Sequence, residues 1–292
     1  MSNGLQMTRR IRRTPYTDRV EALGVSGFTV VNHTLLPKAF GHSVQDDYWH
    51  LREHVQLWDV GCQRQVEIQG PDATRLVQWM TPRDMRGVRV GQCVYTPLVD
   101  HKGLLVNDPI TLKLAEDRYW LSIADSDVAL YALGLARGAG LDAEVEEADI
   151  WPLAIQGPEA ETVVSALFGN HLKDLGFFAF TTIELDGRPC VIARTGYSGQ
   201  GGFEVYADPT QGQLAWDQLW EAGQAHAMRP GCPNLIDRIE TGLISFGNDM
   251  TRDDSPLEAG LSRWCDLEVD TGVRMCTKGA WSVTAVKYRP YM

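Results

Sequence analysis

VEIQGPDATRLVQWM (residues 66–80) and PLAIQGPEAETVVSALF (residues 152–168) share one pattern and indicate a duplicated module. Each copy begins with alternating apolar residues, which predict a strand, and continues through Gln-Gly-Pro, which predicts a turn with the proline opening a helix. In both helices the apolar residues recur at spacings of three and four: Ala73, Leu76, Val77 and Met80, then Ala160, Val163, Val164 and Leu167. Because there are only two copies and they lie far apart in the sequence, the pattern is not that of a solenoid. The alternative to a duplicated module is that a common turn motif recurs by chance.

The segments around these copies switch between strand and helix signals and predict an α+β fold with mostly antiparallel sheets and flanking helices. Two strands are predicted within residues 94–114, joined at residues 101–103, and a third at residues 118–124. Helices are predicted over residues 215–227 and 235–247, the second with an apolar face made of Ile236, Ile239, Leu243 and Phe246. Because there is no regular βα alternation and no GxGxxG after a first strand, a dinucleotide-binding fold is disfavoured.

Composition narrows the classes of function. The 292 residues are 44% hydrophobic and carry a net charge of -11, which predicts a globular protein with a sizeable core and argues against a general nucleic-acid binder. No apolar run is long enough for a membrane span or a signal peptide, so a cytoplasmic protein is expected. Six cysteines without a CxxC pair predict reduced thiols. A basic cluster in residues 9–13 is interpreted as part of a solvated arm.

HLREH, residues 50–54, matches the H-x-x-E-H pattern of one class of zinc protease. On a helix His50 and His54 would share a face, and Glu53 could serve as a general base. Zinc also needs a third protein ligand, and no downstream residue is marked as one by its context. An exposed helix side rich in histidine and charge is therefore the favoured interpretation, and no metal site is predicted.

RTGYSGQGGFEVY, residues 194–206, is rich in glycine but lacks the lysine and the helix start of a phosphate-binding loop. It enters a strand pattern in which Glu204 and Tyr206 share a face. A carboxylate there would repel phosphate and suits a heterocycle that carries N–H groups, whereas a bulged hairpin is the purely structural alternative.

In VNDP, residues 106–109, Asp108 follows an apolar strand and either faces a cavity or closes a turn.

These two motifs resemble a known family. RTGYSGQGGFEVY resembles the RTGYTGEDGFEI-type signature of the folate-dependent glycine-cleavage aminomethyltransferases (T-proteins), and YTPLVDHKGLLVNDP resembles their segment that ends in an aspartate beside the folate. Other segments resemble the branch of this family that demethylates dimethylsulfoniopropionate: RRTPYTDRVEALGVSGFTVVNHTLLP, DDYWHLREHVQLWDVGCQRQVEIQGPDA, LSIADSDV, RPGCPNLIDRIE and LISFGNDMTRDDSPLE. The resemblance runs from about residue 12 to residue 260 and makes HLREH part of an ordinary family helix.

The resemblance implies the T-protein folate-binding fold and a division of the chain. An N-terminal arm is expected over residues 1–30. Residues 31–260 are expected to form the folate-binding region, as two related subdomains over about 31–150 and 151–260. Residues 261–292 are expected to be a divergent remnant of a shortened C-terminal β-barrel lobe.

The resemblance also implies an activity: transfer of the sulfonium methyl of dimethylsulfoniopropionate to N5 of tetrahydrofolate, giving methylmercaptopropionate and 5-methyl-tetrahydrofolate. Tetrahydrofolate is the implied cofactor, as methyl acceptor, and the sulfonium compound is the implied small-molecule partner. Neither nucleic acid nor a membrane is expected as a partner. A homodimer is among the expected partners, because exposed apolar surface favours association.

Site residues follow from the resemblance and from the chemistry of a sulfonium. Asp108 is the implied catalytic residue, and Tyr95, Asp108 and Glu204 are the implied folate contacts. Candidates for binding the substrate are Ser122, Phe178, Tyr197 and Tyr206, because aromatic faces attract a sulfonium cation and its carboxylate needs a donor, from Ser122 or from a backbone N–H. A neutral thioether leaves without help, so positioning should dominate the catalysis and no metal is required.

Four other functions remain open at this point. The chain could act as a glycine-cleavage-type aminomethyltransferase, as a demethylase of another methylated small molecule, as a non-catalytic folate-binding protein, or as a zinc peptidase. Three observations separate these functions. The methyl or aminomethyl donor that is used distinguishes the transferases, folate affinity without turnover indicates the non-catalytic protein, and sensitivity to chelators indicates the zinc peptidase.

Overall fold

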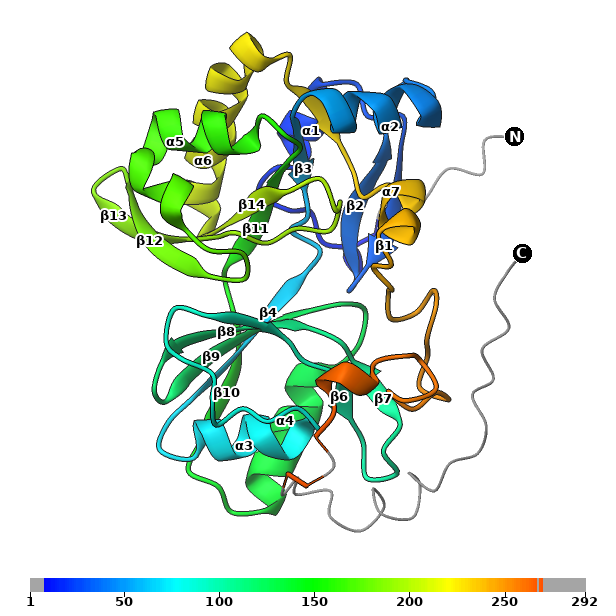
Figure 1. Ribbon diagram of the computed structural model, residues 1–292, viewed down its shortest axis with the longest axis vertical. Helices are drawn as coiled ribbons and strands as arrows, with labels where there is room; N and C mark the ends of the chain where they lie inside the picture. The colour runs from blue at the N-terminus through cyan, green and yellow to red at the C-terminus, as the bar shows by residue number, and fades with distance from the viewer. Residues whose placement is uncertain (1–7, 267, 270–292) are drawn as a thin grey trace. The chain divides into compact units, whose positions relative to one another are not determined.

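The structure is a computed structural model that describes residues 8–266, 268 and 269. These residues form two units, each assembled from two separate stretches of the chain (Figure 1). Unit 1 combines the described residues up to 64 with residues 149–243, and unit 2 combines residues 65–148 with the described residues from 244 onward.

The units therefore differ from the predicted subdomains, which run without interruption over 31–150 and 151–260. Strand pairing is the physical reason. Strand β3 (Gln56–Asp59) lies beside β11 (Trp151–Gln156), so the backbone hydrogen bonds of β3 tie the early part of the chain to the second copy of the repeated module. Most of the predicted C-terminal remnant, 261–292, lies outside the described residues.

Unit 1 is built on a six-stranded sheet and a separate two-stranded hairpin. Its further strands are β1 (Gly27–Val31), β2 (Thr34–Ala39), β12 (Phe180–Leu185), β13 (Arg188–Ala193), β14 (Gly202–Ala207) and β15 (Arg229–Gly231). Its helices are α1 (Thr17–Ala22), α2 (Val44–Glu53), α5 (Ala160–Phe168), α6 (Pro209–Gly223) and α7 (Leu235–Glu240), with short 3-10 turns η1 (Asn170–Asp174) and η2 (Gln224–His226). The large sheet has the order β12-β13-β14-β11-β3-β15, and its pairs are antiparallel except that β15 runs parallel to β3.

The core of unit 1 lies between this sheet and helices α5 and α6, which cover one of its faces (Figure 1). Leu153 pairs with Val205 and Ile155 pairs with Phe203 across β11 and β14, and all four side chains are buried in this core. Side chains alternate between the two faces of a strand. Glu204 therefore points to the face opposite the core.

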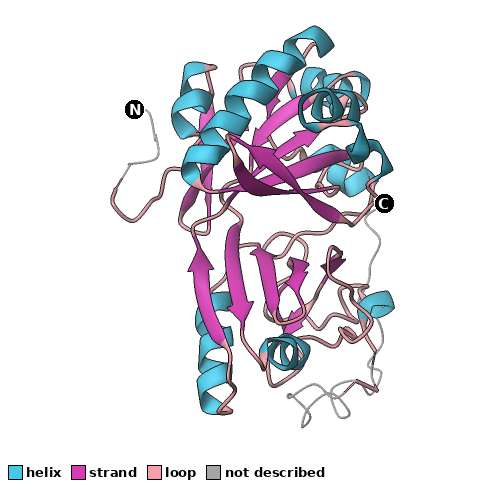
Figure 2. Ribbon diagram, turned by 90° about the vertical axis from the view of Figure 1, so that its left-hand side faces the viewer, coloured by secondary structure: helices cyan, strands magenta, loops and turns pink. Residues whose placement is uncertain are grey.

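Unit 2 has a five-stranded sheet in the order β10-β4-β9-β8-β5 and a separate β6-β7 hairpin. The strands are β4 (Arg64–Gln69), β5 (Cys93–Tyr95), β6 (Leu98–Val99), β7 (Leu105–Asn107), β8 (Ile110–Ala115), β9 (Arg118–Ile123) and β10 (Glu144–Ala148). The helices are α3 (Ala73–Met80) and α4 (Val128–Gly138), with a 3-10 turn η3 (Ser262–Trp264). Helices α3 and α4 pack on the large sheet and enclose a second core, and Figure 2 shows the strands and helices of each unit by colour.

The repeated module is confirmed in both units. Strand β4 leads into α3 and strand β11 leads into α5, and the predicted apolar residues of both helices face the cores. Each helix begins two residues after the proline, at Ala73 and at Ala160. The turn glycines Gly70 and Gly157 have φ values of 123° and 118°, and a Cβ at Gly157 would lie 2.2 Å from the His54 carbonyl oxygen. Only glycine fits this close approach of two backbones.

The predictions for 94–114 and 235–247 are wrong in detail. Residues 94–114 contribute to four strands, β5 to β8, because Pro97 and Pro109 have no N–H to donate and so interrupt the ladders. The second prediction places one helix over residues 235–247, but α7 ends at Glu240 and Gly242 follows with a φ of 72°. Of the predicted apolar face, Ile236 and Ile239 in α7 are exposed, at 44% and 62%, whereas Phe246, beyond the helix, is buried; α7 itself buries Asp237 and Arg238.

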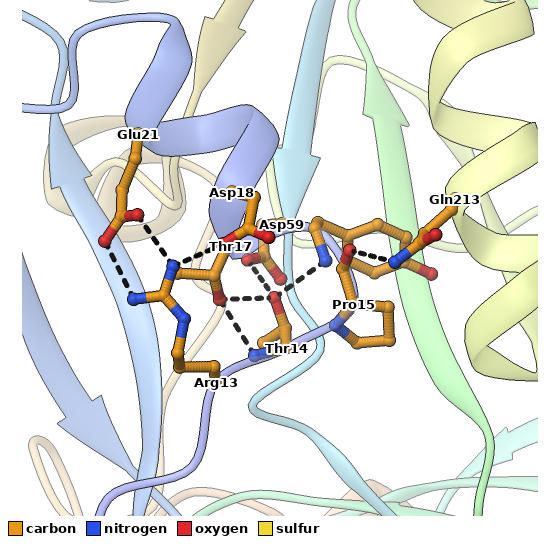
Figure 3. Close-up of polar contacts among 9 residues, drawn as sticks. Arg13, Thr14, Pro15, Thr17, Asp18, Glu21, Asp59 and Gln213 are labelled. Carbon is orange, nitrogen blue, oxygen red and sulfur yellow. Dashed lines mark hydrogen bonds and ion pairs between the residues drawn. The ribbon is translucent and has the colours of Figure 1, made fainter. Parts of the chain in front are cut away.

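The prediction of an N-terminal arm over residues 1–30 is also wrong for the residues that the structure describes. Tyr16 is fully buried in the core of unit 1, where its ring stacks on Trp216 and its hydroxyl donates to the Trp151 carbonyl at 2.8 Å. Arg13 from the basic cluster binds both Asp18 and Glu21 (Figure 3). The segment is part of the fold because it buries aromatic surface.

A buried carboxylate anchors this segment (Figure 3). Asp59, at the end of β3, is 1% exposed and accepts hydrogen bonds from the Thr14 hydroxyl at 2.6 Å and from the Gly61 backbone N–H at 3.0 Å. Burial raises the pKa of Asp59 to about 7, although both hydrogen bonds oppose this rise. The folded protein therefore keeps a proton on Asp59 at a pH where the unfolded chain has released it.

We expect Asp59→Asn to reduce the pH dependence of stability. Because the folded state binds more protons between about pH 4 and about pH 7, Asp59 makes the free energy of unfolding fall as pH rises, by up to about 1.4 kcal/mol per pH unit. Urea unfolding across this range measures the slope, which should be shallower in the asparagine variant by the contribution of Asp59. Thr14→Val removes a hydrogen bond that lowers this pKa, so it should extend the slope above pH 7. An unchanged slope in Asp59→Asn would contradict this account.

Candidate active site

The glycine-rich motif forms the connection of a β-hairpin in unit 1. Strands β13 and β14 pair antiparallel, and the intervening residues 194–201 form the connecting loop. This confirms the predicted hairpin and the strand that begins at Gly202. The alternation along β14 places Glu204 and Tyr206 on one face, as predicted, and the hydroxyl of Tyr206 lies 3.1 Å from Glu204 Oε2.

The Glu204 carboxylate is buried and held from one side. Its Oε2 accepts hydrogen bonds from the hydroxyls of Thr195 and Tyr206, and the side chain is 5% exposed. Burial raises the pKa of Glu204, and the two hydroxyls lower it. Oε1 has no hydrogen-bond partner within the described part of the chain. Oε1 can therefore accept a hydrogen bond from an N–H group of a ligand. The two hydroxyls on Oε2 fix the orientation of the carboxylate and thus the direction in which Oε1 points.

The other predicted residues of unit 1 occupy different positions. Tyr206 is 1% exposed, so its ring is packed inside the unit and its hydroxyl serves Glu204. Tyr197 is half-buried in the glycine-rich loop and donates from its hydroxyl to the Leu243 carbonyl at 3.3 Å. Phe178 is half-buried, and its backbone N–H donates to the Arg194 carbonyl at the start of the same loop, at 3.1 Å. Tyr197 thus lies within the loop that leads to Glu204, and Phe178 lies beside the start of this loop.

Sequence reasoning missed Gln156, which holds this loop together. Its amide accepts from the Ser198 hydroxyl at 2.7 Å and donates to the Thr195 carbonyl at 3.3 Å, and the side chain is fully buried. A Cβ at Gly196 would lie 2.1 Å from Gln156 Oε1, so the motif needs glycine there for close packing. The sequence signal for Gln156 is the Gln-Gly-Pro of the second module, a pattern that by itself predicts only a turn.

Asp108 lies in unit 2, between β7 and β8, and the structure brings it together with Tyr95. The Tyr95 hydroxyl donates to Asp108 Oδ2 at 2.9 Å. Burial raises the pKa of Asp108 to about 7, while the Tyr95 hydroxyl and the Phe246 backbone N–H lower it and the charge of Asp249 raises it further. Near neutral pH the carboxyl group is therefore populated in both protonation states, as a group that exchanges a proton requires.

The corner that carries Asp108 is fixed by its neighbours. Asn107 is fully buried, and its amide donates to the Ser126 hydroxyl at 2.8 Å and accepts from the Ala124 backbone N–H at 3.1 Å. The ring of Tyr95 packs against Trp264, with centroids 4.6 Å apart. Trp264 was not singled out in the sequence. Asp108 is thus held by a rigid strand end and by an aromatic pair.

Ser122 lies in the same sheet as Tyr95. Across β5, β8 and β9, Tyr95 pairs with Ile110 and Ile110 pairs with Ser122, so these side chains form one row on a face of the sheet. The Ser122 hydroxyl is buried and accepts from Gln65 Nε2 at 2.9 Å. The role of Ser122 as a substrate contact stays a prediction, and its hydroxyl already has a structural partner in Gln65.

The H-x-x-E-H motif is used structurally. His50 is buried in α2 and donates from Nε2 to the Ala227 carbonyl at 2.8 Å, while His54 lies just beyond the end of the helix. Within residues 8–266, 268 and 269, no group of three His, Cys, Asp or Glu side chains could hold a metal ion. Nor does any helix in this described part have the length and apolar character needed to cross a membrane.

Comparison with known proteins identifies the family. Residues 16–269 match the GCVT N-terminal domain. The chain belongs to the GCVT family. It is 49% identical, over 90% of its length, to the dimethylsulfoniopropionate demethylase DmdA of Ruegeria pomeroyi, of which it covers 72%. It is 34% identical, over 72% of its length, to the aminomethyltransferase of Alkaliphilus metalliredigens, of which it covers 58%.

Solved structures agree with this GCVT assignment. The chain is similar to the glycine cleavage system aminomethyltransferase T of Bartonella henselae, with a TM-score of 0.76 and 26% identity, over 90% of this chain and 71% of that one. The family resemblance and the α+β fold class predicted from the sequence are therefore confirmed. The roles of individual site residues stay predictions.

Proposed function

We propose that this GCVT-family chain is a tetrahydrofolate-dependent methyltransferase that demethylates dimethylsulfoniopropionate. Its 49% identity over 90% of the chain to a dimethylsulfoniopropionate demethylase supports this function most strongly. The expected products are methylmercaptopropionate and 5-methyl-tetrahydrofolate. The expected homodimer and the cytoplasmic location stay predictions.

The residues of unit 1 fit the pterin ring of a folate. Glu204 Oε1 has no partner among the described residues, while Oε2 is held by two hydroxyls. A carboxylate oriented in this way accepts hydrogen bonds from N–H groups, which the pterin carries on one edge. We assign Glu204 to the pterin and Thr195 and Tyr206 to the orientation of Glu204.

Asp108 is proposed to take up a proton. When bound, tetrahydrofolate supplies the N5 lone pair that accepts the methyl group. The C–S bond breaks with its electron pair moving to sulfur, which leaves as a neutral thioether, and the N5–C bond forms. The N5 proton must then be released, and the Asp108 carboxylate can accept it because its pKa is about 7. Tyr95 keeps this carboxylate in place by its hydrogen bond to Oδ2.

Aromatic rings that present a face to the substrate would bind its sulfonium cation by cation–π attraction. Tyr197 in the glycine-rich loop and Phe178 beside the start of this loop are half-buried, so part of each side chain is accessible. A cation over such a ring gains roughly 0.5–2 kcal/mol. We propose these two residues as contacts of the methyl donor, whereas Tyr206 contributes through Glu204 because its own ring is buried.

Aminomethyl transfer is the second candidate function, favoured by the structural similarity to a glycine cleavage aminomethyltransferase. Donor competition separates the two functions. The purified protein is incubated with tetrahydrofolate and dimethylsulfoniopropionate, and methylmercaptopropionate is quantified with glycine, sarcosine or dimethylglycine present in excess. We expect product from the sulfonium alone and no inhibition by the amines. Folate product formed only from an amine would assign the chain to another branch of the family.

A further inference from the structure

Arg83 lies on a rigid loop that follows α3 in unit 2. Its backbone N–H donates to the Thr81 hydroxyl at 3.1 Å, and its carbonyl accepts from Gln78 Nε2 at 2.8 Å. The Thr81 hydroxyl in turn donates to the Pro97 carbonyl at 2.6 Å. The position of the Arg83 Cα is thus fixed by hydrogen bonds on both sides.

The guanidinium of Arg83 has one described partner, and this partner is not an acid. One nitrogen donates to the Tyr95 carbonyl at 2.8 Å. No carboxylate among the described residues forms an ion pair with it, and burial lowers its pKa without any compensating acidic neighbour. Two other half-buried arginines do have such partners: Arg52 pairs with Glu240 at 2.5 Å, and Arg194 pairs with Glu161 at 2.8 Å.

A half-buried cation without a counter-charge is costly unless an anion completes the site. The remaining N–H donors of Arg83 are not among the described buried polar atoms without partners, so solvent and small solutes reach them. A guanidinium presents these donors as a planar fork that matches a carboxylate. The missing counter-charge is therefore best supplied by a carboxylate from outside the chain.

Tyr95 links this cation to the proposed methyl-transfer site. Its carbonyl accepts from Arg83, and its hydroxyl donates to Asp108. We infer that Arg83 binds a carboxylate of the small molecule that reacts beside Asp108. Ser122, the side-chain donor considered from the sequence, is a weaker choice because its hydroxyl is buried against Gln65.

Two carboxylates have the required chemistry: the propionate end of the sulfonium substrate and the glutamate tail of the folate. Naming either of them rests on the proposed function. The existence of an anion site at Arg83 does not depend on that function, because it follows from the unpaired cation alone. The experiment therefore measures binding and methyl transfer separately.

The first part measures dissociation constants by calorimetry for methylmercaptopropionate and for tetrahydrofolate. Three variants are compared with the unmodified chain: Arg83→Met, Arg83→Lys and Arg86→Met. Methionine keeps most of the aliphatic stem, and lysine keeps the charge but loses the planar fork. Arg86 is the matched control, since it lies in the same loop, is 74% exposed and pairs with Asp84.

We expect Arg83→Met to weaken the binding of one of the two ligands by roughly 10- to 100-fold, the range for loss of a hydrogen bond to a charged group. Arg83→Lys should recover part of this loss, and Arg86→Met should have no effect. If Arg83→Met binds methylmercaptopropionate more weakly, the carboxylate bound by Arg83 is that of the substrate. If it binds tetrahydrofolate more weakly, but not a tetrahydropterin that lacks the glutamate tail, the carboxylate bound by Arg83 is that of the tail.

Unchanged affinity of both ligands in Arg83→Met would overturn the inference, whatever the methyl-transfer rate. If instead carboxylate binding depends on Arg83 but the unmodified chain produces no 5-methyl-tetrahydrofolate, the anion site stands and the proposed function fails. Should Arg83→Met not fold, the lysine variant decides the question alone, because it must still bind more weakly than the unmodified chain.

Discussion

Replacing Asp108 with alanine is expected to lower the rate of demethylation by about 10²- to 10⁴-fold, the range for loss of a group that transfers a proton. The reason is that no carboxylate then accepts the proton from N5. Folding should suffer much less, because Asp108 lies just beyond the end of β7 and Asn107 carries the buried contacts of the corner. Turnover under saturating substrate and urea unfolding measure the two effects.

Two further variants define the role of Asp108. Asp108→Asn can still accept the Tyr95 hydrogen bond but cannot take up a proton, so it should be as inactive as the alanine variant. Asp253→Asn, exposed in the same unit, serves as the matched control and should keep full activity. If either Asp108 variant turned over at the normal rate, the proposed role of Asp108 would be wrong.

The rate should also depend on pH in a defined direction. The pKa of Asp108 is about 7, so its carboxyl is increasingly protonated below that pH and can no longer accept a proton. Activity should therefore rise through pH 7 and level off above it. Tyr95→Phe removes a hydrogen bond that lowers this pKa, so it should move the midpoint of the profile to higher pH.

Replacing Glu204 with glutamine is expected to weaken tetrahydrofolate binding by roughly 10- to 100-fold, which corresponds to the loss of hydrogen bonds to a charged acceptor. A neutral amide oxygen accepts more weakly from pterin N–H groups than a carboxylate does. The amide also places an NH₂ group, which cannot accept, where the carboxylate has its second oxygen. Calorimetric titration with tetrahydrofolate measures the affinity directly. The KM for tetrahydrofolate should rise accordingly.

Graded variants test how Glu204 is held. Thr195→Val and Tyr206→Phe each remove one of the two hydroxyls on Oε2, so each should weaken folate binding less than Glu204→Gln does. Glu184→Gln, on an exposed position of β12 in the same sheet, should leave binding unchanged. Normal tetrahydrofolate affinity in Glu204→Gln would remove this residue from the folate site.

Local chemistry made part of the fold predictable. The Gln-Gly-Pro turns preceded helices with regular apolar spacing, and the structure has both helices where expected. The face shared by Glu204 and Tyr206 followed from strand alternation alone. These features depend on residues that are close in sequence, which is why a pattern sufficed.

Features that depend on distant residues could not be predicted. The assembly of each unit from two stretches of chain follows from the pairing of β3 with β11, to which neither strand's own pattern points. Helix α7 has apolar residues at helical spacing, yet it buries Asp237 and exposes Ile239, so tertiary packing overrides the pattern. The N-terminal segment is part of the fold because Tyr16 is buried, a contact hidden beside four arginines in the sequence.

The site shows the same division. The family resemblance of the surrounding motifs points to Tyr95, Asp108 and Glu204, whereas the hydrogen bond between Tyr95 and Asp108 and the role of Thr195 as a partner of Glu204 come from the structure. Gln156 was hidden within a turn motif. Arg83 has no signal in the sequence, because it is one of three arginines in residues 83–89 and nothing there distinguishes it, and only the structure shows that its guanidinium has no carboxylate partner among the described residues.

The most direct measurement of the central claim follows the methyl group itself. Dimethylsulfoniopropionate labelled with ¹³C in its S-methyl groups is incubated with the protein and tetrahydrofolate, and ¹³C NMR records where the label goes. We predict that the label appears on N5 of 5-methyl-tetrahydrofolate in equal amount to the methylmercaptopropionate formed, and that Asp108→Ala slows its appearance by the same factor as it slows demethylation. A label that stays on the sulfonium, or that leaves it without reaching N5, would contradict the account.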